Sequence, residues 1–303
     1  VIILKRIQNI IKEVIMQEKP NTNNKRPGKS PQKNHNNKSK SRNNTPKKAV
    51  NKSKQTKNSI DTKVFALGGL NEVGKNMYCV EHDNELFIID AGVKFAEEGL
   101  PGIDYVIPDY SYLKRNEKKI RGLMITHGHE DHIGGIPFLL QVVKIPFIYA
   151  TPLASAMIKR KLDEKRLTNA TKIIQIDDEY QIKSKYFNIG FFKTNHSIPE
   201  SMGIIINSPN GRIVETGDFK FDLSPVGDPA DYQKMSFLGE TGVTLLMSDS
   251  TNSEVPTFSI SEKKVANSVQ EEFRKTEGRL IVATFASNVH RVQQIVELSL
   301  IHI

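Results

Sequence analysis

Four side chains that can bind metal ions lie within six residues of this sequence. His127, His129, Asp131 and His132 belong to a segment that reads T-H-G-H-E-D-H-I-G-G and directly follows an apolar run. Imidazole and carboxylate groups suit zinc and similar divalent ions. The spacing lets the first two histidines point to one side and Asp131 and His132 to the other. Two ions about 3.5–4 Å apart could then be held for metal-assisted hydrolysis. The alternative, a solvated histidine-rich loop, leaves this density of ligands unexplained.

Further candidates follow apolar segments elsewhere in the chain. His196 lies in K-T-N-H-S-I and Asp218 in E-T-G-D-F. Alone, a His or Asp at a strand end usually has a structural role. Beside the H-x-H-x-D-H segment, we expect His196 to add a nitrogen ligand to one ion and Asp218 to bridge both. Asp90, which ends the run F-I-I-D, has two interpretations: it orients a ligand histidine from behind, or it caps the following loop.

These candidates need strands that end beside one another. Apolar runs between turn-forming residues predict many strands interleaved with helices, which is typical of a layered α/β domain with helices outside packed sheets. The predicted strands cover residues 64–67, 77–81, 86–91, 122–125, 147–150, 172–176, 187–193, 203–207, 212–215, 243–248 and 280–283. The predicted helices cover residues 133–143, 152–165 and 261–275, and a last one begins at residue 289.

The two ends of the chain differ from this pattern. Residues 1–61 carry 16 Lys or Arg and 3 Asp or Glu, which leaves 27 basic and 31 acidic residues in the remainder. Such a polar, basic segment predicts a disordered N-terminal extension. It either attracts nucleic acid weakly or only improves solubility. Residues 298–303, L-S-L-I-H-I, match the translated end of a transposon used in sequencing libraries. We interpret them as an artefact, with a genuine helix end as the alternative.

Cysteine content and hydropathy bear on the compartment. Cys79 is the only cysteine, so no intrachain disulfide is expected, and a reducing cytoplasm is the natural interpretation. The longest apolar runs are far shorter than a membrane span, so no membrane association is expected.

The sequence segments around the candidate ligands resemble those of a known family. The H-G-H-E-D-H segment with Asp90, His196 and Asp218 resembles the metallo-β-lactamase fold. Five further segments resemble bacterial ribonuclease J within that fold: L-G-G-L-N-E-V-G-K-N, D-A-G-V-K-F, G-L-P-G-I-D-Y-V-I-P-D, S-D-S-T-N and F-A-S-N-V-H-R. The likeness covers roughly residues 63–297.

The resemblance implies an αββα metallo-β-lactamase sandwich interrupted by a β-CASP domain. We expect residues 62–260 to form the first part of the β-lactamase domain and residues 261–297 to begin the β-CASP insert, which is cut short. Later family motifs, which hold a substrate phosphate and supply a further metal ligand, would then be missing, and the chain as given is expected to be impaired. The matched motifs also place Asp249, Asn288, His290 and Arg291 near RNA.

The activity implied is metal-dependent cleavage of RNA, exonucleolytic from 5′ to 3′ and endonucleolytic, in RNA turnover and ribosomal RNA maturation. Two divalent ions, zinc or alternatively Mn²⁺, would be held by His127, His129 and His196 on one side and by Asp131 and His132 on the other, with Asp218 between them. Asp131, His132 and Asp218 are the predicted catalytic residues. The implied partner is single-stranded RNA with a 5′-monophosphate, and the full-length protein is expected to form homo-oligomers. A small-molecule hydrolase of the same fold and a non-catalytic RNA-binding protein remain the alternatives.

Overall fold

A computed structural model gives the structure of the chain and describes residues 60–97 and 99–300. Nearly all of the predicted disordered extension, and the last three residues of the predicted artefact, lie outside the described residues.

The first sheet contains the strand that leads into the H-x-H-x-D-H segment. Its order is β1-β2-β3-β6-β7-β8, antiparallel from β1 to β3 and parallel from β3 to β8. The strands are β1 (Lys63–Gly68), β2 (Met77–His82), β3 (Glu85–Ile89), β6 (Ile120–Met124), β7 (Phe147–Ala150) and β8 (Lys172–Gln175). Because β3, β6 and β7 run in parallel, the loops after them lie at one edge of the sheet, where α/β proteins bind ligands.

The second sheet carries the other two candidates. Its order is β13-β12-β11-β10-β9, antiparallel except for the parallel pair β12 and β13. The strands are β9 (Ile182–Lys183), β10 (Asn188–Lys193), β11 (Met202–Ser208), β12 (Gly211–Glu215) and β13 (Leu245–Met247). A separate hairpin pairs β4 (Lys94–Phe95) with β5 (Tyr105–Val106).

Alternating side chains divide the interior into layers. In β3, Leu86 and Ile88 join a buried cluster with residues of the helices below the first sheet, such as Ile158. Phe87 and Ile89 point the other way and pack with residues of β10 and β11 in a cluster between the two sheets. Every side chain of β3 is therefore buried, as expected for a strand covered on both faces.

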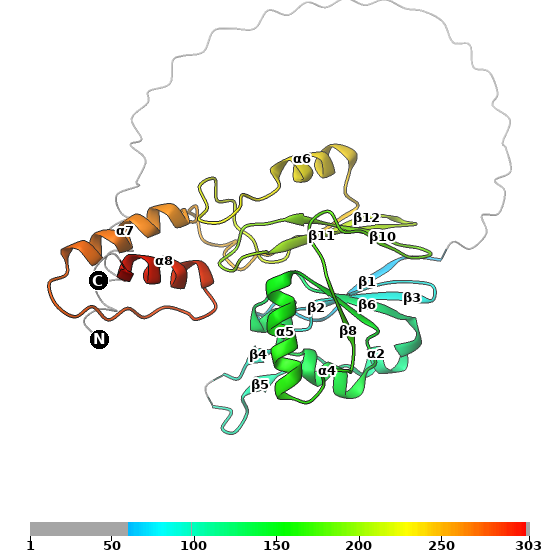
Figure 1. Ribbon diagram of the computed structural model, residues 1–303. Helices are drawn as coiled ribbons and strands as arrows, with labels where there is room; N and C mark the ends of the chain where they lie inside the picture. Colours follow the sequence, from blue (N-terminus) through cyan, green and yellow to red (C-terminus); the bar gives the residue numbers. More distant parts are fainter. Residues whose placement is uncertain (1–59, 98, 301–303) are drawn as a thin grey trace, which may run out of the picture. The chain divides into compact units, whose positions relative to one another are not determined.

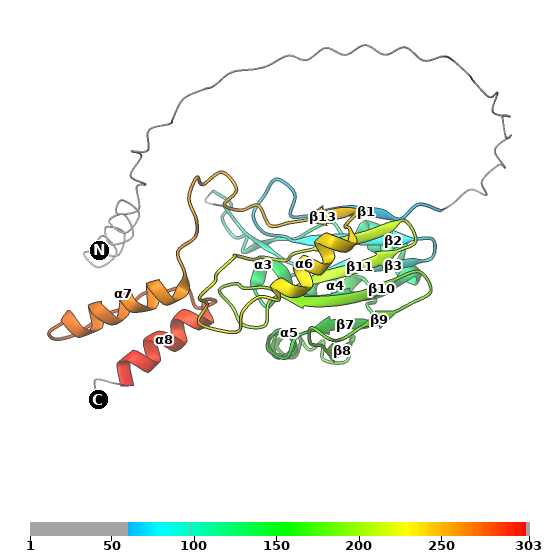
Figure 2. The ribbon, with the colours of Figure 1, turned by 90° about the horizontal axis from the view of Figure 1, so that it is seen from above.

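Helices cover both outer faces and complete a four-layer sandwich (Figures 1 and 2). Below the first sheet lie α2 (Ser111–Arg115), α4 (Ile136–Val142) and α5 (Pro152–Glu164). The 3-10 turn η1 (Glu117–Lys119) follows α2 in the chain, and the short helix α3 (Glu130–Ile133) precedes α4. Above the second sheet lies α6 (Tyr232–Thr241), which packs Leu238 against Phe192, Ile205 and Val214. Two helices follow in the chain, α7 (Glu262–Lys275) and α8 (Val289–Leu300). The predicted αββα architecture is confirmed.

Most predicted elements are present, with two corrections. The predicted helix over residues 133–143 is interrupted, because the Gly135 N–H bonds to the Ala91 carbonyl instead of to its own helix. The predicted strand over residues 280–283 is wrong: Ile281 and Val282 are exposed, and the segment pairs with no strand in the described part of the chain. Helix α6 was missed, although Asp231 caps its start by accepting from Lys234 N.

No helix among the described residues combines the length and the apolar character needed to cross a membrane.

Candidate metal centre

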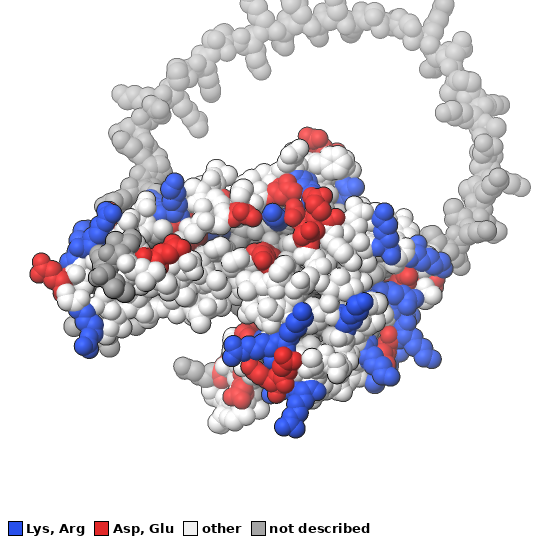
Figure 3. Space-filling view, in the orientation of Figure 1, with Lys and Arg blue, Asp and Glu red and all other residues white. Residues whose placement is uncertain are grey.

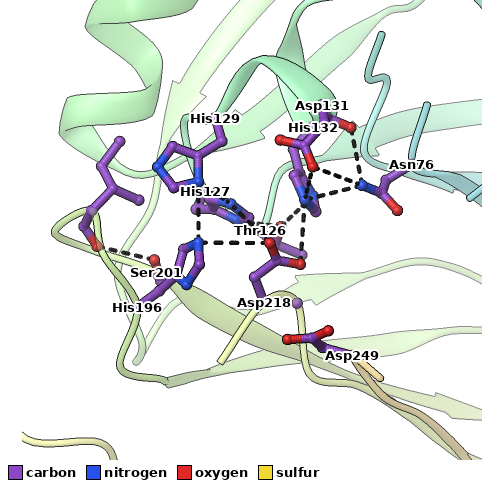
Figure 4. Close-up of polar contacts among 12 residues, drawn as sticks. Asn76, Thr126, His127, His129, Asp131, His132, His196, Ser201, Asp218 and Asp249 are labelled. Carbon is purple, nitrogen blue, oxygen red and sulfur yellow. Dashed lines mark hydrogen bonds and ion pairs between the residues drawn. The ribbon is translucent and has the colours of Figure 1, made fainter. Parts of the chain in front are cut away.

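The candidate residues come from both sheets and meet at one end of the sandwich. Asp90 directly follows β3, and the segment from Thr126 to His132 follows β6 and continues into α3. From the second sheet, His196 follows β10 and Asp218 follows β12. His127 and Asp218, 91 positions apart in the sequence, therefore face one another (Figure 4).

Three histidines and a carboxylate form a first group. His129 Nδ1 lies 3.1 Å from His127 Nε2 and 3.1 Å from His196 Nε2. Asp218 Oδ2 lies 3.9 Å from His127 Nε2 and 3.6 Å from His196 Nε2. One potential ligand atom from each of these four residues lies within 4.8 Å of all the others. Three imidazoles and one carboxylate form a donor set that suits zinc.

Two carboxylates and a histidine form a second group beside the first. His132 Nε2 lies 3.5 Å from Asp131 Oδ2 and 3.4 Å from Asp218 Oδ1. These three residues also bring one potential ligand atom each to within 4.8 Å of one another. Asp218 thus belongs to both groups and turns a different oxygen toward each of them (Figure 4).

Asp90 lies behind the second group and fixes the ring of His132. Its Oδ2 accepts a hydrogen bond from His132 Nδ1 at 2.7 Å and one from Thr126 Oγ1 at 2.8 Å. Its Oδ1 accepts from the Thr126 backbone N–H at 2.9 Å, which ties the loop after β6 to the end of β3. With Nδ1 engaged in this way, Nε2 of His132 faces Asp131 and Asp218. These contacts fit the first interpretation of Asp90, which orients a candidate ligand histidine, and they run to the loop after β6 rather than to the loop that follows Asp90 itself.

Burial and charge set the protonation of the histidines. Burial lowers the pKa of His127 well below its ordinary value and lowers the pKa of His196 to about 4. Both rings are therefore neutral near pH 7, with lone pairs free to bind a cation. Burial alone would lower the pKa of His132 as well, but Asp90 and the hydrogen bonds to Asp131 and Asp218 raise it well above its ordinary value. The residues present fit divalent cations, since the neutral imidazoles of His127 and His196 converge here with ionised carboxylates, and a cation bound at His132 would displace its proton.

The second group opens into a cavity of about 900 Å³. Asp249, one of the predicted RNA contacts, lines this cavity together with Asp131, His132 and Asp218. Glu215, which no sequence pattern singled out, also lines it. Burial, and then the charge of Asp90, raise the pKa of Glu215 to about 8.

The other predicted RNA contacts lie at the start of α8. Asn288 caps this helix by accepting from Arg291 N at 3.1 Å. His290 lines a second cavity, of about 390 Å³, together with His196. Arg291 forms an ion pair with Glu262 at 3.0 Å. The carbonyl of Ser287, just before them, lies 3.2 Å from His129 Nε2, so this segment reaches the first group.

Sequence reasoning gave no role to two contacts around the metal-binding loop. The Asn76 side chain lies against Asp131 and His132, 55 and 56 residues away. Glu130, which lies between two candidate ligands in the sequence, forms a 2.5 Å ion pair with Lys161 of α5. No local sequence pattern indicates either contact, because each contact depends on how elements distant in the sequence pack together.

Known proteins resemble this chain in sequence and fold. A family model described as "Metallo-beta-lactamase superfamily" matches residues 70–236. "Ribonuclease J 1" of Streptococcus pyogenes is 55% identical over 234 residues, which are 77% of this chain and 42% of that protein. "Ribonuclease J" of Mycoplasma genitalium is 46% identical over 239 residues, covering 79% of this chain and 42% of the relative. The resemblance inferred from the motifs is confirmed, and the chain spans about 42% of the length of these two curated relatives.

A solved structure supports the fold. A crystal structure of a protein of unknown function from Enterococcus faecalis V583 superposes with a TM-score of 0.60 at 18% identity, covering 78% of this chain and 63% of that one. The family model spans more than half of the chain, and the two sheets and their outer helices have the architecture expected of that family. The chain therefore belongs to the metallo-beta-lactamase superfamily.

Proposed function

We propose that the protein containing this chain is a metal-dependent ribonuclease. The observation that carries this proposal is Asp218, whose two oxygens turn toward two adjacent groups of metal-binding side chains. A shared carboxylate would hold two cations close together, and two adjacent cations are the arrangement that two-metal phosphodiester hydrolysis uses. Because the similar proteins are named ribonucleases, we infer that the substrate is RNA.

Each residue has a defined part in this proposal. His127, His129 and His196 hold one cation, Asp131 and His132 hold the other, and Asp218 spans both. Bound there, divalent cations supply a nucleophile near neutral pH and stabilise charge on the scissile phosphate. Asp90 keeps Nε2 of His132 turned into the site. Zinc is the proposed metal because imidazole dominates the first group, and Mn²⁺ is the second choice because carboxylates dominate the other.

The finer activity rests on resemblance to ribonuclease J. We propose 5′-to-3′ exonucleolysis together with endonucleolysis of single-stranded RNA carrying a 5′-monophosphate, in RNA turnover and ribosomal RNA maturation in the cytoplasm. A homo-oligomeric state of the full-length protein belongs to the same proposal. Asp249 lines the cavity at the second group, which supports its proposed place near RNA.

We also propose that the β-CASP insert begins near residue 261. The three buried clusters of the sandwich contain no residue beyond Met247. Helix α7 has no buried residue in the described chain, and its Glu262 forms ion pairs with Lys220 and Arg291. These helices therefore add little to the core of the β-lactamase domain.

The test is RNA hydrolysis by the full-length protein, with and without a chelator. Changing His129 and Asp131 to Ala should abolish cleavage, because each cation loses a ligand. A matched double variant is Arg160→Ala with Glu164→Ala, an exposed ion pair on α5 that should leave cleavage unchanged. Undiminished cleavage in the first variant contradicts the proposal. Faster hydrolysis of thioester or lactam substrates than of RNA would instead favour a small-molecule hydrolase. RNA binding without cleavage would favour a non-catalytic RNA-binding protein.

A further inference from the structure

The loop between β1 and β2 lies against the metal-binding segment. Its backbone turns through four left-handed conformations, at Gly69, Asn71, Gly74 and Lys75, with φ of 87°, 55°, 95° and 54°. Asn and Gly tolerate this region, whereas Lys75 adopts it at a cost. The Lys75 N–H bonds to the Val93 carbonyl at 3.0 Å, which holds the loop beside the segment after β3. This path brings Asn76 next to Asp131.

The backbone of Asn76 is fixed independently of its side chain. Its N–H donates to the Asp131 carbonyl at 3.1 Å, and its carbonyl accepts from the Gly92 N–H at 3.0 Å. Both bonds remain when the side chain is replaced, so the loop keeps its anchoring in a side-chain variant.

The Asn76 side chain reaches the metal-facing atoms of the second group (Figure 4). Its Nδ2 donates to Asp131 Oδ2 at 3.4 Å and to the Asp131 carbonyl at 3.2 Å. The same nitrogen lies 3.1 Å from His132 Nε2. Tyr78 Oη donates to Asn76 Oδ1 at 3.4 Å and to the Gly69 carbonyl at 3.2 Å, which orients the amide.

We propose that Asn76 is the positioning residue of the second group and holds Asp131 in the conformation that binds the second cation. The proposal rests on the proposed metal-dependent function and extends it to a residue outside the ligand set. Asp131 has a side chain that is 29% exposed at the open side of the site, so its carboxylate needs a partner to stay turned toward His132 and Asp218. A neutral amide suits this place, since a lysine would repel the cation and another carboxylate would repel Asp131.

The experiment compares metal binding to this chain and to its Asn76→Ala and Asn76→Leu variants. Zn²⁺ is titrated against a competing chelator to obtain two dissociation constants, and Co²⁺ absorption reports the geometry of each site. In both variants the dissociation constant of the second ion should rise about 10–100-fold, as is typical when a partner of a metal ligand is removed. The constant of the first ion should change less than about twofold, because Asn76 contacts none of the first group's histidines in the described chain. Asn188→Ala, an exposed change at the start of β10, is the matched control.

The leucine variant separates hydrogen bonding from packing, because leucine fills a similar volume without a donor. If Asn76→Leu kept the second ion and Asn76→Ala lost it, the volume of the side chain rather than its hydrogen bonds would hold Asp131, and the proposal would be overturned. Unchanged binding in both variants, equal loss of both ions, or a wild-type chain that binds a single ion would also overturn it. A full-length wild-type protein that binds two ions without cleaving RNA would refute the proposed function and leave the role of Asn76 standing.

Discussion

At the scale of single residues, the two carboxylates of the site differ in which of the two groups of metal-binding side chains their oxygens face. Asp218 turns Oδ2 toward His127 and His196 of the first group and Oδ1 toward His132. Asp131 faces only the second group. Burial would raise the pKa of Asp218, but the hydrogen bond to His132 and the charge of His132 lower it. Both carboxylates are therefore ionised at neutral pH, and their different positions predict different losses when each is neutralised.

We expect Asp218→Asn to weaken both ions and Asp131→Asn to weaken one. Each change removes a ligand charge, so the affected dissociation constants should rise by more than the roughly 10–100-fold seen when only an outer partner is removed. Metal stoichiometry after dialysis against graded chelator concentrations measures both variants. Loss of a single ion in Asp218→Asn would show that this carboxylate does not bridge.

At the scale of elements, close backbone contacts position the metal-binding loop. The carbonyl of Asp131 accepts from Asn76 N, and Gly135 N bonds to Ala91 O, so tertiary hydrogen bonds replace helical ones between α3 and α4. Gly92 lies directly against this segment: a Cβ atom added there would come 1.5 Å from the Asp131 carbonyl oxygen. The metal loop and the loop after β3 can approach so closely only because no side chain separates them.

Gly92→Ala should therefore destabilise the protein and displace Asp131. Overpacking of this kind costs about 1–3 kcal/mol or more, and the second ion should be lost with it. Gly190→Ala is the matched control, because nothing lies within 4 Å of a Cβ atom added there, and its effect should stay within about 0.5 kcal/mol. Urea unfolding gives the free energies of unfolding. Equal values for the two variants would contradict the steric role assigned to Gly92.

A buried glutamate connects the two sheets at the other end of the sandwich. Glu85, 6% exposed at the start of β3, accepts from Ser184 Oγ at 2.7 Å and from Tyr186 N at 3.1 Å, in the link between β9 and β10. Burial would raise the pKa of Glu85, but these hydrogen bonds and the charge of Arg121 lower it. A carboxylate with a lowered pKa stabilises the folded state fully above its unfolded pKa and loses that contribution as pH falls through the folded value.

Glu85→Gln should accordingly lower the free energy of unfolding by about 1–3 kcal/mol at pH 7. The difference from wild type should shrink as the pH falls below about 4.3, the ordinary glutamate pKa. Urea titrations at several pH values, with chelator present, measure this difference in the free energy of unfolding. Glu164→Gln changes a 61% exposed side chain and should have little effect at any pH. If the difference in free energy of unfolding between Glu85→Gln and wild type grew as the pH fell, Glu85 would not be a stabilising carboxylate with a lowered pKa.

The sequence predicted elements whose pattern is local and missed contacts that depend on packing. H-x-H-x-D-H and the strand-end positions of His196 and Asp218 pointed to residues that the fold brings together. The apolar run at residues 280–283 predicted a strand, but a strand also needs a neighbour to pair with, and a single segment does not reveal one. Asn76 was missed for the same reason, since its importance depends on a loop that crosses from β1 to β2 beside Asp131.

At the scale of the whole molecule, the charges divide unevenly along the chain. Residues 62–303 contain 27 basic and 31 acidic residues, whereas residues 1–61 contain 16 and 3. Basic and acidic side chains are interspersed on the face shown in Figure 3, with basic ones gathered on the side of β3 and α2. The metal groups themselves consist of four histidines and two carboxylates, with no Lys or Arg. Long-range attraction to the RNA backbone is therefore expected to come mainly from the N-terminal segment.

Deleting residues 17–60 should leave the chemistry intact and weaken RNA binding at low salt. The segment removed contains 13 Lys or Arg and 1 Asp or Glu, a balance of +12 against +9 for the whole chain, but none of the candidate ligands. For single-stranded RNA, the slope of log K against log salt should become shallower by about 0.7 for every phosphate that the segment neutralises. The turnover rate at saturating RNA should match that of the intact protein, and the two affinities should converge as salt rises and screens the charges. RNA affinity measured across a salt series, together with single-turnover cleavage, tests both statements. A loss of cleavage at saturating RNA would show that the segment takes part in folding or in the site, whereas an unchanged salt slope would show that it only aids solubility.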